Sequence, residues 1–299
     1  TTYDPQTIWG SAIGDFENFR RSTLDDGSIA LQVATTEKNL IQWLTTSAGG
    51  IIVGTSGDEW TITAEGNVIT ATNVQIKRQS SYGAEYRQAL PVNEVVLFIQ
   101  RGGRKLREHV FSFERDGYIA PDLTLLADHI TRGGVRSMAL MQQPDTIVWM
   151  ARNDGMLLGM TYERDQQVVA WHRHPTAGEV ESVTTIYGAN GDELWLVVKR
   201  GSRRFIERLD PQTLAANEAN ANSVGLCYLD SSLAQVVEEP MANVVGISHL
   251  NGQTVDVLAD GAVHPSRVVA SGFITLQAPA LNACVGLPFT SLCHINSFD

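Results

Sequence analysis

The sequence predicts an all-β fold, a β-propeller of about five or more blades with a small additional β unit at the C-terminus. Four apolar strands each run into a glycine-bearing tight turn and continue as a second strand. The turn glycines are Gly57, Gly103, Gly155 and Gly201, at spacings of 46, 52 and 46 residues. A hairpin that recurs at this period is typical of one blade in a radial β-repeat.

The segments around these turns are short, rich in Val, Ile, Thr and Trp, and bounded by Gly, Asn, Asp and Pro. This composition predicts strands separated by turns. In chain order the expected strands are 41–46, 50–55, 59–63, 73–78, 94–100, 109–113, 135–141, 146–151, 157–162, 168–174, 181–187, 193–198 and 204–209.

One segment, 122–130, predicts a short helix that connects two blades. Leu123, Leu126, Ala127 and Ile130 recur at helical spacing, and Asp122 follows a proline in a position to cap the N-terminus. The polar stretch 210–223 predicts a loop or a short helix.

Composition changes near residue 240, where the regular spacing of turn glycines ends. Two further turn signals, Asn251-Gly252 and Asp260-Gly261, fall in this part. We therefore expect a propeller over residues 1–235 and a small β-rich unit over 236–299.

The formal net charge of −11 argues against a general nucleic-acid binder, whose domain is usually basic. An acidic surface can still face DNA where passage rather than capture is the task. No apolar stretch is long enough to span a bilayer, and the N-terminus has no secretory signal. The cysteines, Cys227, Cys284 and Cys293, are expected as reduced thiols, with a Cys284–Cys293 bridge left open.

No catalytic, cofactor or metal site is predicted, and the chain is not expected to be an enzyme. His172 and His174 could place two imidazoles on one face of a strand, but no third ligand stands at a recognisable spacing. A glycosidase needs two carboxylates in one pocket. The acidic residues that we considered for such a pair are expected to be solvated turn residues: Asp58, Glu59, Asp116, Asp154, Glu163 and Asp165.

Basic residues gather at two of the repeated turns. Because equivalent turns of a propeller emerge on one rim, we expect a basic face on an acidic body, suited to phosphates or to an acidic partner subunit. An ordinary solvated hairpin tip is the alternative. The residues of this candidate rim for assembly or DNA contact are Arg101, Arg104, Lys105 and Arg107 at the first turn, and Lys199, Arg200, Arg203 and Arg204 at the second.

The chain also resembles a known family through several ordered motifs. They are GDFENF (14–19), TSGDEW (55–60), QSSYG (79–83), VLFIQRGGRKLRE (96–108), YIAPDLTLLADHI (118–130), QQPDTIVWMARNDGMLLGMTY (142–162) and VVAWHRHPTAGEVESV (168–183). In this order they are similar to the central region of phage tail nozzle proteins, also called tail tubular protein B, of short-tailed phages. The later segments ISHLNGQTVDVLADGAV (247–263) and GFITLQAPALNACVGLPFTS (272–291) are similar to the β-rich portion that follows the propeller in that family. The resemblance covers about residues 8 to 292.

This resemblance implies a structural virion protein without catalytic activity. It implies copies of the chain in a sixfold ring that extends the DNA ejection channel, with portal, adaptor and fibre or spike proteins as partners and double-stranded DNA passing through. Localisation would be the virion, after synthesis in the host cytoplasm. Full-length members of the family are longer, so the chain is expected to be a fragment.

Two other functions stay open. A carbohydrate-binding or carbohydrate-cleaving propeller for host recognition would show an acidic pair in a sugar-sized pocket. A general protein-interaction propeller would show an aromatic-rich face on a monomer.

Overall fold

The structure is a computed structural model. It describes residues 4–22, 24–33, 39–47, 49–66, 68–189, 191–209, 229–288 and 290. The chain divides into two compact units. Unit 1 comprises Thr1–His174 and Val180–Thr185, and unit 2 comprises Pro175–Glu179 and Ile186–Asp299.

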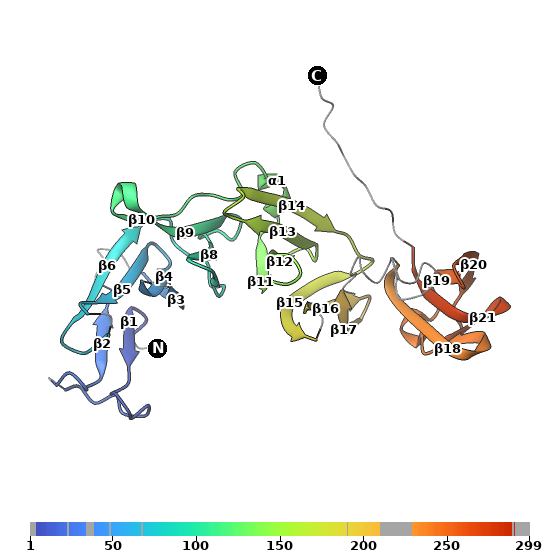
Figure 1. The fold of residues 1–299 in the computed structure, drawn as a ribbon, viewed down its shortest axis with the longest axis horizontal. Helices are drawn as coiled ribbons and strands as arrows, with labels where there is room; N and C mark the ends of the chain where they lie inside the picture. The colour runs from blue at the N-terminus through green and yellow to red at the C-terminus, as the bar shows by residue number, and fades with distance from the viewer. Residues whose placement is uncertain are drawn as a thin grey trace, which may run out of the picture. The chain divides into compact units, whose positions relative to one another are not determined.

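Unit 1 contains three four-stranded antiparallel sheets, each with a predicted hairpin as its two central strands (Figure 1). The first consists of β3 (Ile41–Ser47), β4 (Gly50–Thr55), β5 (Glu59–Ala64) and β6 (Val74–Ser80). The second consists of β7 (Leu90–Val92), β8 (Val95–Ile99), β9 (Leu106–Ser112) and β10 (Gly117–Ile119). The third consists of β11 (Val135–Met141), β12 (Ile147–Arg152), β13 (Leu157–Glu163) and β14 (Val168–His174).

In all three sheets each strand pairs with its neighbours in sequence, which is the up-and-down order of a propeller blade. A two-stranded sheet of β1 (Thr7–Gly10) and β2 (Ile29–Gln32) precedes them.

Apolar side chains fill the space between successive sheets of unit 1. Leu97 and Ile99 of the second sheet share one core cluster with Met150 and Leu158 of the third, and all four are fully buried. Trp43 of the first sheet packs on Phe98 of the second, with ring centroids 5.6 Å apart. Burial of such large side chains contributes about 1.5–3 kcal/mol each, so the sheets are held by their faces.

Unit 2 carries the fourth repeat and a further sheet. The fourth hairpin joins β16 (Gly191–Arg200) to β17 (Arg203–Leu209). Their three-stranded sheet also contains β15 (Glu179–Gly188), of which residues Val180–Thr185 belong to unit 1. The last sheet is ordered β18 (Asp230–Val245), β21 (Phe273–Leu287), β19 (Thr254–Ala259) and β20 (Ala262–Val268).

These sheets confirm the predicted class, an all-β propeller fold with an additional β unit at the C-terminal end. All four predicted hairpins form at their glycines. Gly103, Gly155 and Gly201 have φ of 75°, 85° and 60°, which other residues rarely adopt. The blade count stays a prediction, and so does the boundary after residue 235, a position that falls within β18.

The predicted helix over 122–130 is wrong in extent. The structure has one helical turn there, α1 (Asp128–Thr131), preceded by Ala127 as its N-cap residue. Asp122 instead accepts hydrogen bonds from the backbone nitrogen and hydroxyl of Thr124. Such a local side-chain turn competes with helix formation, which holds the first residues of the segment in a non-helical conformation.

The expectation of a reduced thiol is also wrong for Cys284, which is buried and disulfide-bonded. Cys227, Cys293 and the predicted loop or helix at 210–223 lie outside the described residues. Among the described residues, no helix is long and apolar enough to cross a membrane.

Candidate functional site

The first basic turn, between β8 and β9, is partly neutralised by acids that follow it in the chain. Arg104 forms an ion pair with Asp128 at 3.2 Å, and Lys105 forms one with Asp122 at 2.7 Å. Burial would raise the pKa of Asp122, but hydrogen bonds from Lys105 and Thr124 outweigh it and lower that pKa. Arg101 is exposed. The turn therefore presents less free positive charge than its composition suggests.

Arg107 does not belong to an exposed rim. Its side chain is buried, with Nε donating to Gln100 Oε1 at 2.8 Å and Nη1 donating to the carbonyl of Ala120. The guanidinium lies over the Tyr82 ring, 3.5 Å from its centroid. This cation–π contact joins the second sheet to the β6–β7 connection, which is a role in packing.

At the second basic turn, between β16 and β17, some basic side chains are likewise paired with acids and others are exposed. Lys199 pairs with Glu179 at 3.1 Å on the surface. Arg203 and Arg204 are exposed, and Arg204 also interacts within the chain. Because the two turns belong to different units, their union on one rim stays a prediction.

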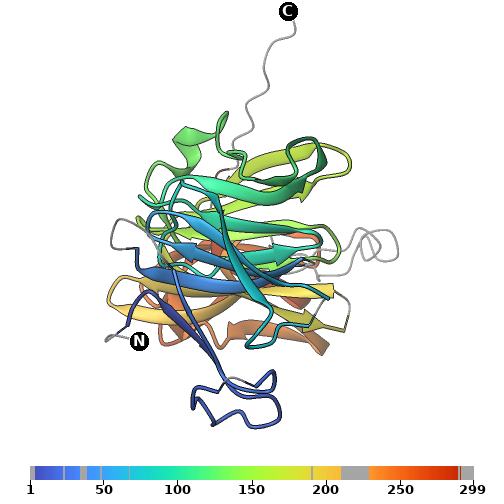
Figure 2. The same cartoon turned by 90° about the vertical axis from the view of Figure 1, so that its left-hand side faces the viewer.

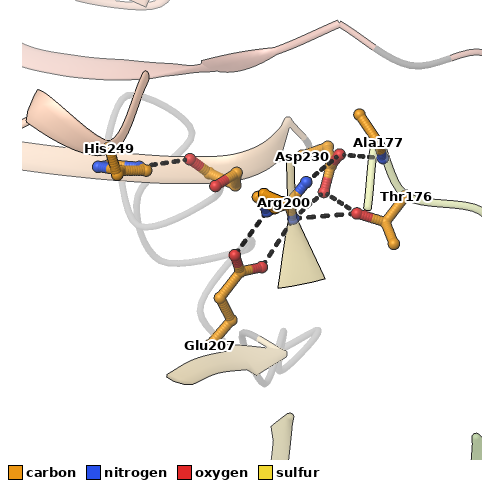
Figure 3. Close-up of polar contacts among 7 residues, drawn as sticks. Thr176, Ala177, Arg200, Glu207, Asp230 and His249 are labelled. Atoms are coloured by element: carbon orange, nitrogen blue, oxygen red, sulfur yellow. Dashed lines mark hydrogen bonds and ion pairs between the residues drawn. The ribbon is translucent and has the colours of Figure 1, made fainter. Parts of the chain in front are cut away.

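Arg200 is the centre of a polar network in unit 2 (Figure 3). Its Nε and Nη2 donate to the two carboxylate oxygens of Glu207, at 2.6 and 2.7 Å. Its Nη1 and Nη2 donate to the two oxygens of Asp230, at 3.2 and 2.9 Å. Thr176 Oγ1 and the backbone nitrogen of Ala177 donate to the same Asp230 carboxylate, at 2.7 and 2.8 Å.

This Arg200 junction ties together the segment before β15, the β16–β17 hairpin and the first residue of β18. The side chains of Arg200 and Asp230 are 10% and 13% exposed. Burial would raise the pKa of Asp230, but the hydrogen bonds from Arg200, Ala177 and Thr176 prevail and lower it. Both groups are therefore charged at neutral pH, and the junction is suited to hold strands in place.

Two acids expected to be solvated are buried. Asp58 and Glu59 are 7% and 0% exposed. Asp58 accepts a hydrogen bond from Asn39 Nδ2 at 2.6 Å, and Glu59 accepts one from the Ser80 hydroxyl at 2.5 Å. Burial raises the pKa of Glu59. The sequence prediction was wrong here because the TSGDEW turn packs inward, against residue 39 and β6.

His172 and His174 do lie on one face of β14, as expected. Nδ1 of His172 is 2.7 Å from Nε2 of His174, and both rings pack on Trp149. Burial lowers both pKa values, that of His174 to about 4. Within the described ranges no group of three His, Cys, Asp or Glu side chains is placed to hold a metal ion.

Unit 1 also has an aromatic groove that was not predicted from the sequence. It has a volume of about 540 Å³, and Phe111, Phe113 and Tyr118 form one ring cluster in its wall. Phe113 is 93% exposed. These rings come from the end of β9, the turn η1 (Phe113–Arg115) and β10. The remaining lining residues are Ser47, Gly49, Glu94, Val110 and Arg164.

The spacing of Phe111 and Phe113 was the signal that could have found this groove. Residues two apart in a strand point to the same face, so the strand expected over 109–113 would place both rings on one side. In the structure Phe111 is in β9 and Phe113 begins η1, and the two rings still meet, 5.4 Å apart. Beneath them, Tyr118 stacks on the buried ring of His109, with centroids 4.6 Å apart. Burial lowers the pKa of His109 to about 4.

Comparisons with known proteins give little further guidance. No family model matches the chain, and no curated protein matches it. Among solved structures, a luciferin-regenerating enzyme is similar with 12% sequence identity and a TM-score of 0.30, over 65% of this chain and 80% of that one. A likeness this weak says nothing about activity.

Proposed function

We propose that the chain is a structural subunit of a phage tail, a nozzle component that extends the DNA ejection channel. The ordered motifs that resemble tail nozzle proteins suggest this function. The structural observation that supports it is that basic side chains form bonds within the chain. Arg107, Arg200 and their partners bind strands of the chain to one another, which is what a scaffold requires.

Unit 1 exposes apolar side chains, as expected of a subunit whose surface is covered by neighbouring subunits. The ring cluster of Phe111, Phe113 and Tyr118 is contiguous, with Phe113 93% and Phe111 42% exposed. A second apolar surface lies on the connection between β1 and β2, where Ile13 and Phe16 are 62% and 85% exposed. Contiguous exposed apolar groups of this kind mark interaction sites, whereas singly scattered ones do not.

Deletion of the coding sequence from its phage, with complementation from a plasmid, tests this function. We expect DNA-filled heads with incomplete tails and a large loss of infectivity, restored by the plasmid copy. Complete tails and unchanged DNA ejection in the deletion strain would refute the proposal.

A carbohydrate-binding propeller is the second candidate, and the aromatic groove favours it. Exposed aromatic rings beside Arg164 and Glu94 suit a sugar, whose apolar face stacks on a ring while its hydroxyl groups form hydrogen bonds. Titration of host-surface oligosaccharides, followed by chemical shifts of the groove residues, distinguishes the two. Saturable shifts that Phe113→Ser removes would support the glycan function.

A further inference from the structure

The segment of residues 11–22, which follows β1, forms a preorganised loop with an aromatic tip. The backbone nitrogen of Ala12 donates to the carbonyl of Asn18 at 2.9 Å, and the nitrogen of Asn18 donates to the carbonyl of Asp15 at 3.2 Å. These bonds close a compact turn that holds Phe16 outward, 85% exposed. A fixed loop loses little conformational entropy when it binds, so this tip is suited to insert into a partner.

The aromatic groove is complementary to this tip in size and in chemistry. Its volume of about 540 Å³ is ample for one aromatic side chain and its flanking residues. Phe111 and Phe113 already meet edge to face, at 5.4 Å and 86°. An inserted phenyl ring would extend this arrangement, which aromatic pairs prefer.

The charges beside the two surfaces are also complementary. Asp15 and Glu17 flank Phe16 in the loop, and Arg164 lines the groove with its side chain 49% exposed. A second pair has the charges reversed: the loop carries the exposed cation Arg20, and the groove is lined by the exposed carboxylate of Glu94. Arg164 also pairs with Glu108 at 2.8 Å, which leaves its exposed edge for a second carboxylate.

The loop and the groove belong to the same unit but to opposite ends of it. In Figures 1 and 2 the dark-blue loop projects at the lower end of unit 1, whereas η1 and β10 lie at the upper end. The tip of one molecule therefore does not reach its own groove. A second copy would bring them together, in a head-to-tail contact of the kind that generates rings or filaments.

We propose that Phe16 of one copy inserts into the groove of Phe111, Phe113 and Tyr118 of the next copy. This contact rests on the proposed function, because it names the surfaces through which tail subunits would meet. It is a heterologous interface in which each copy contributes a loop on one side and a groove on the other.

Photo-cross-linking of the full chain tests the contact directly. Phe16 is replaced by p-benzoyl-phenylalanine, which keeps an aromatic ring, and labelled and unlabelled copies are mixed before irradiation. We expect cross-links between copies that map to residues 110–118. Cross-links confined to other segments, or none at protein concentrations at which the chain associates, would overturn the proposal.

Sedimentation velocity with matched variants measures the strength of the contact. Phe16→Asp and Phe113→Ser should each weaken self-association about 30-fold or more, as expected for a central aromatic anchor. Leu126→Ser is the control, because Leu126 is 95% exposed and lies outside both surfaces. Equal effects of all three variants, or a wild-type chain that stays monomeric up to about millimolar concentration, would contradict the contact.

Reversing both charges of the Arg20–Glu94 pair tests the contact independently of folding, because a misfolded variant would not be rescued by a second substitution. Arg20→Glu and Glu94→Arg should each weaken association, and the double variant should restore it. Loss of association that is not restored would count against the pairing.

The failure of this contact and the failure of the proposed function are distinguishable. Normal tails assembled from Phe16→Asp would overturn the contact and leave the nozzle function intact, whereas normal tails in the deletion strain would overturn the function. Binding of an oligosaccharide in the groove, abolished by Phe113→Ser and without self-association, would replace the proposal with a glycan site.

Discussion

Arg200 and Asp230, thirty positions apart in the sequence, form a two-pronged ion pair in which Nη1 and Nη2 each donate to a different carboxylate oxygen. The same guanidinium binds Glu207 across the hairpin. One partly buried cation therefore joins the fourth repeat to the start of the C-terminal sheet within unit 2.

Removal of this cation should destabilise unit 2. Arg200→Met leaves Asp230 and Glu207 as partly buried charges without a counter-ion, so we expect a loss of about 2–3 kcal/mol in the free energy of unfolding, less than for a fully buried pair. Hydrogen exchange of the β16 and β18 amides measures this loss locally. Lys199→Met is the control from the same turn, because an exposed pair contributes only about 0–1 kcal/mol. Equal protection of these amides from exchange in both variants would show that the Arg200 junction does not stabilise unit 2.

Stability should depend on pH through His109. The ring is 1% exposed, stacks on Tyr118, and has its pKa lowered from 6.5 to about 4 because burial disfavours the cation. Between about pH 6.5 and pH 4 the unfolded chain therefore binds a proton that the folded chain does not, and stability falls as pH falls. The full depression corresponds to about 3 kcal/mol.

The variant His109→Phe keeps a ring of similar size and removes this titration. Urea denaturation at pH 7 and pH 4.5 should show a smaller difference in unfolding free energy for the variant than for the wild type. His172 and His174 titrate in both proteins, so their contribution cancels in the comparison. An unchanged difference would mean that His109 is not buried as a neutral ring.

Gly54 should not tolerate a methyl group. It pairs with Trp43 across β3 and β4, and a Cβ there would lie 2.1 Å from Cε2 of the indole. Gly54→Ala should cost about 1–3 kcal/mol of unfolding free energy through overpacking. Gly117→Ala is the matched control, since its nearest heavy atom would be 3.7 Å away. Thermal denaturation that ranks the two variants equally would contradict this packing.

The predicted basic rim can be tested through its exposed members alone. Arg101→Glu combined with Arg203→Glu should lower the incorporation of the chain into particles while leaving its folding intact, because neither residue lies in the buried networks. Arg136→Glu serves as a control at an exposed position in β11, outside both turns. Quantitative mass spectrometry of purified particles gives the incorporation. Equal incorporation of all variants would leave ordinary solvated hairpin tips as the explanation.

The hairpins were predictable because their determinants are local. Three of the four have a turn glycine with positive φ, which requires only a few consecutive residues. The predicted helix failed for the same reason, because Asp122 binds Thr124 next to it and helical periodicity does not reveal such a bond. In both cases the conformation is determined by residues that are close together in the sequence.

The candidate site was less predictable because its determinants are distant in sequence. The sequence shows that Arg104 and Arg200 are basic, but not that Asp128 and Asp230 meet them after twenty-four and thirty residues. Pairing of this kind depends on how the strands pack. The aromatic groove likewise requires the end of β9 to meet β10, which places Phe111 against Tyr118 at 5.4 Å.

Immunogold electron microscopy of purified phage particles, with antibody against this chain, tests the central claim most directly. If the chain is a tail nozzle subunit, the label should lie at the tail, at the end of the DNA channel. A chain that is absent from purified particles, or found only outside the virion, would contradict the account.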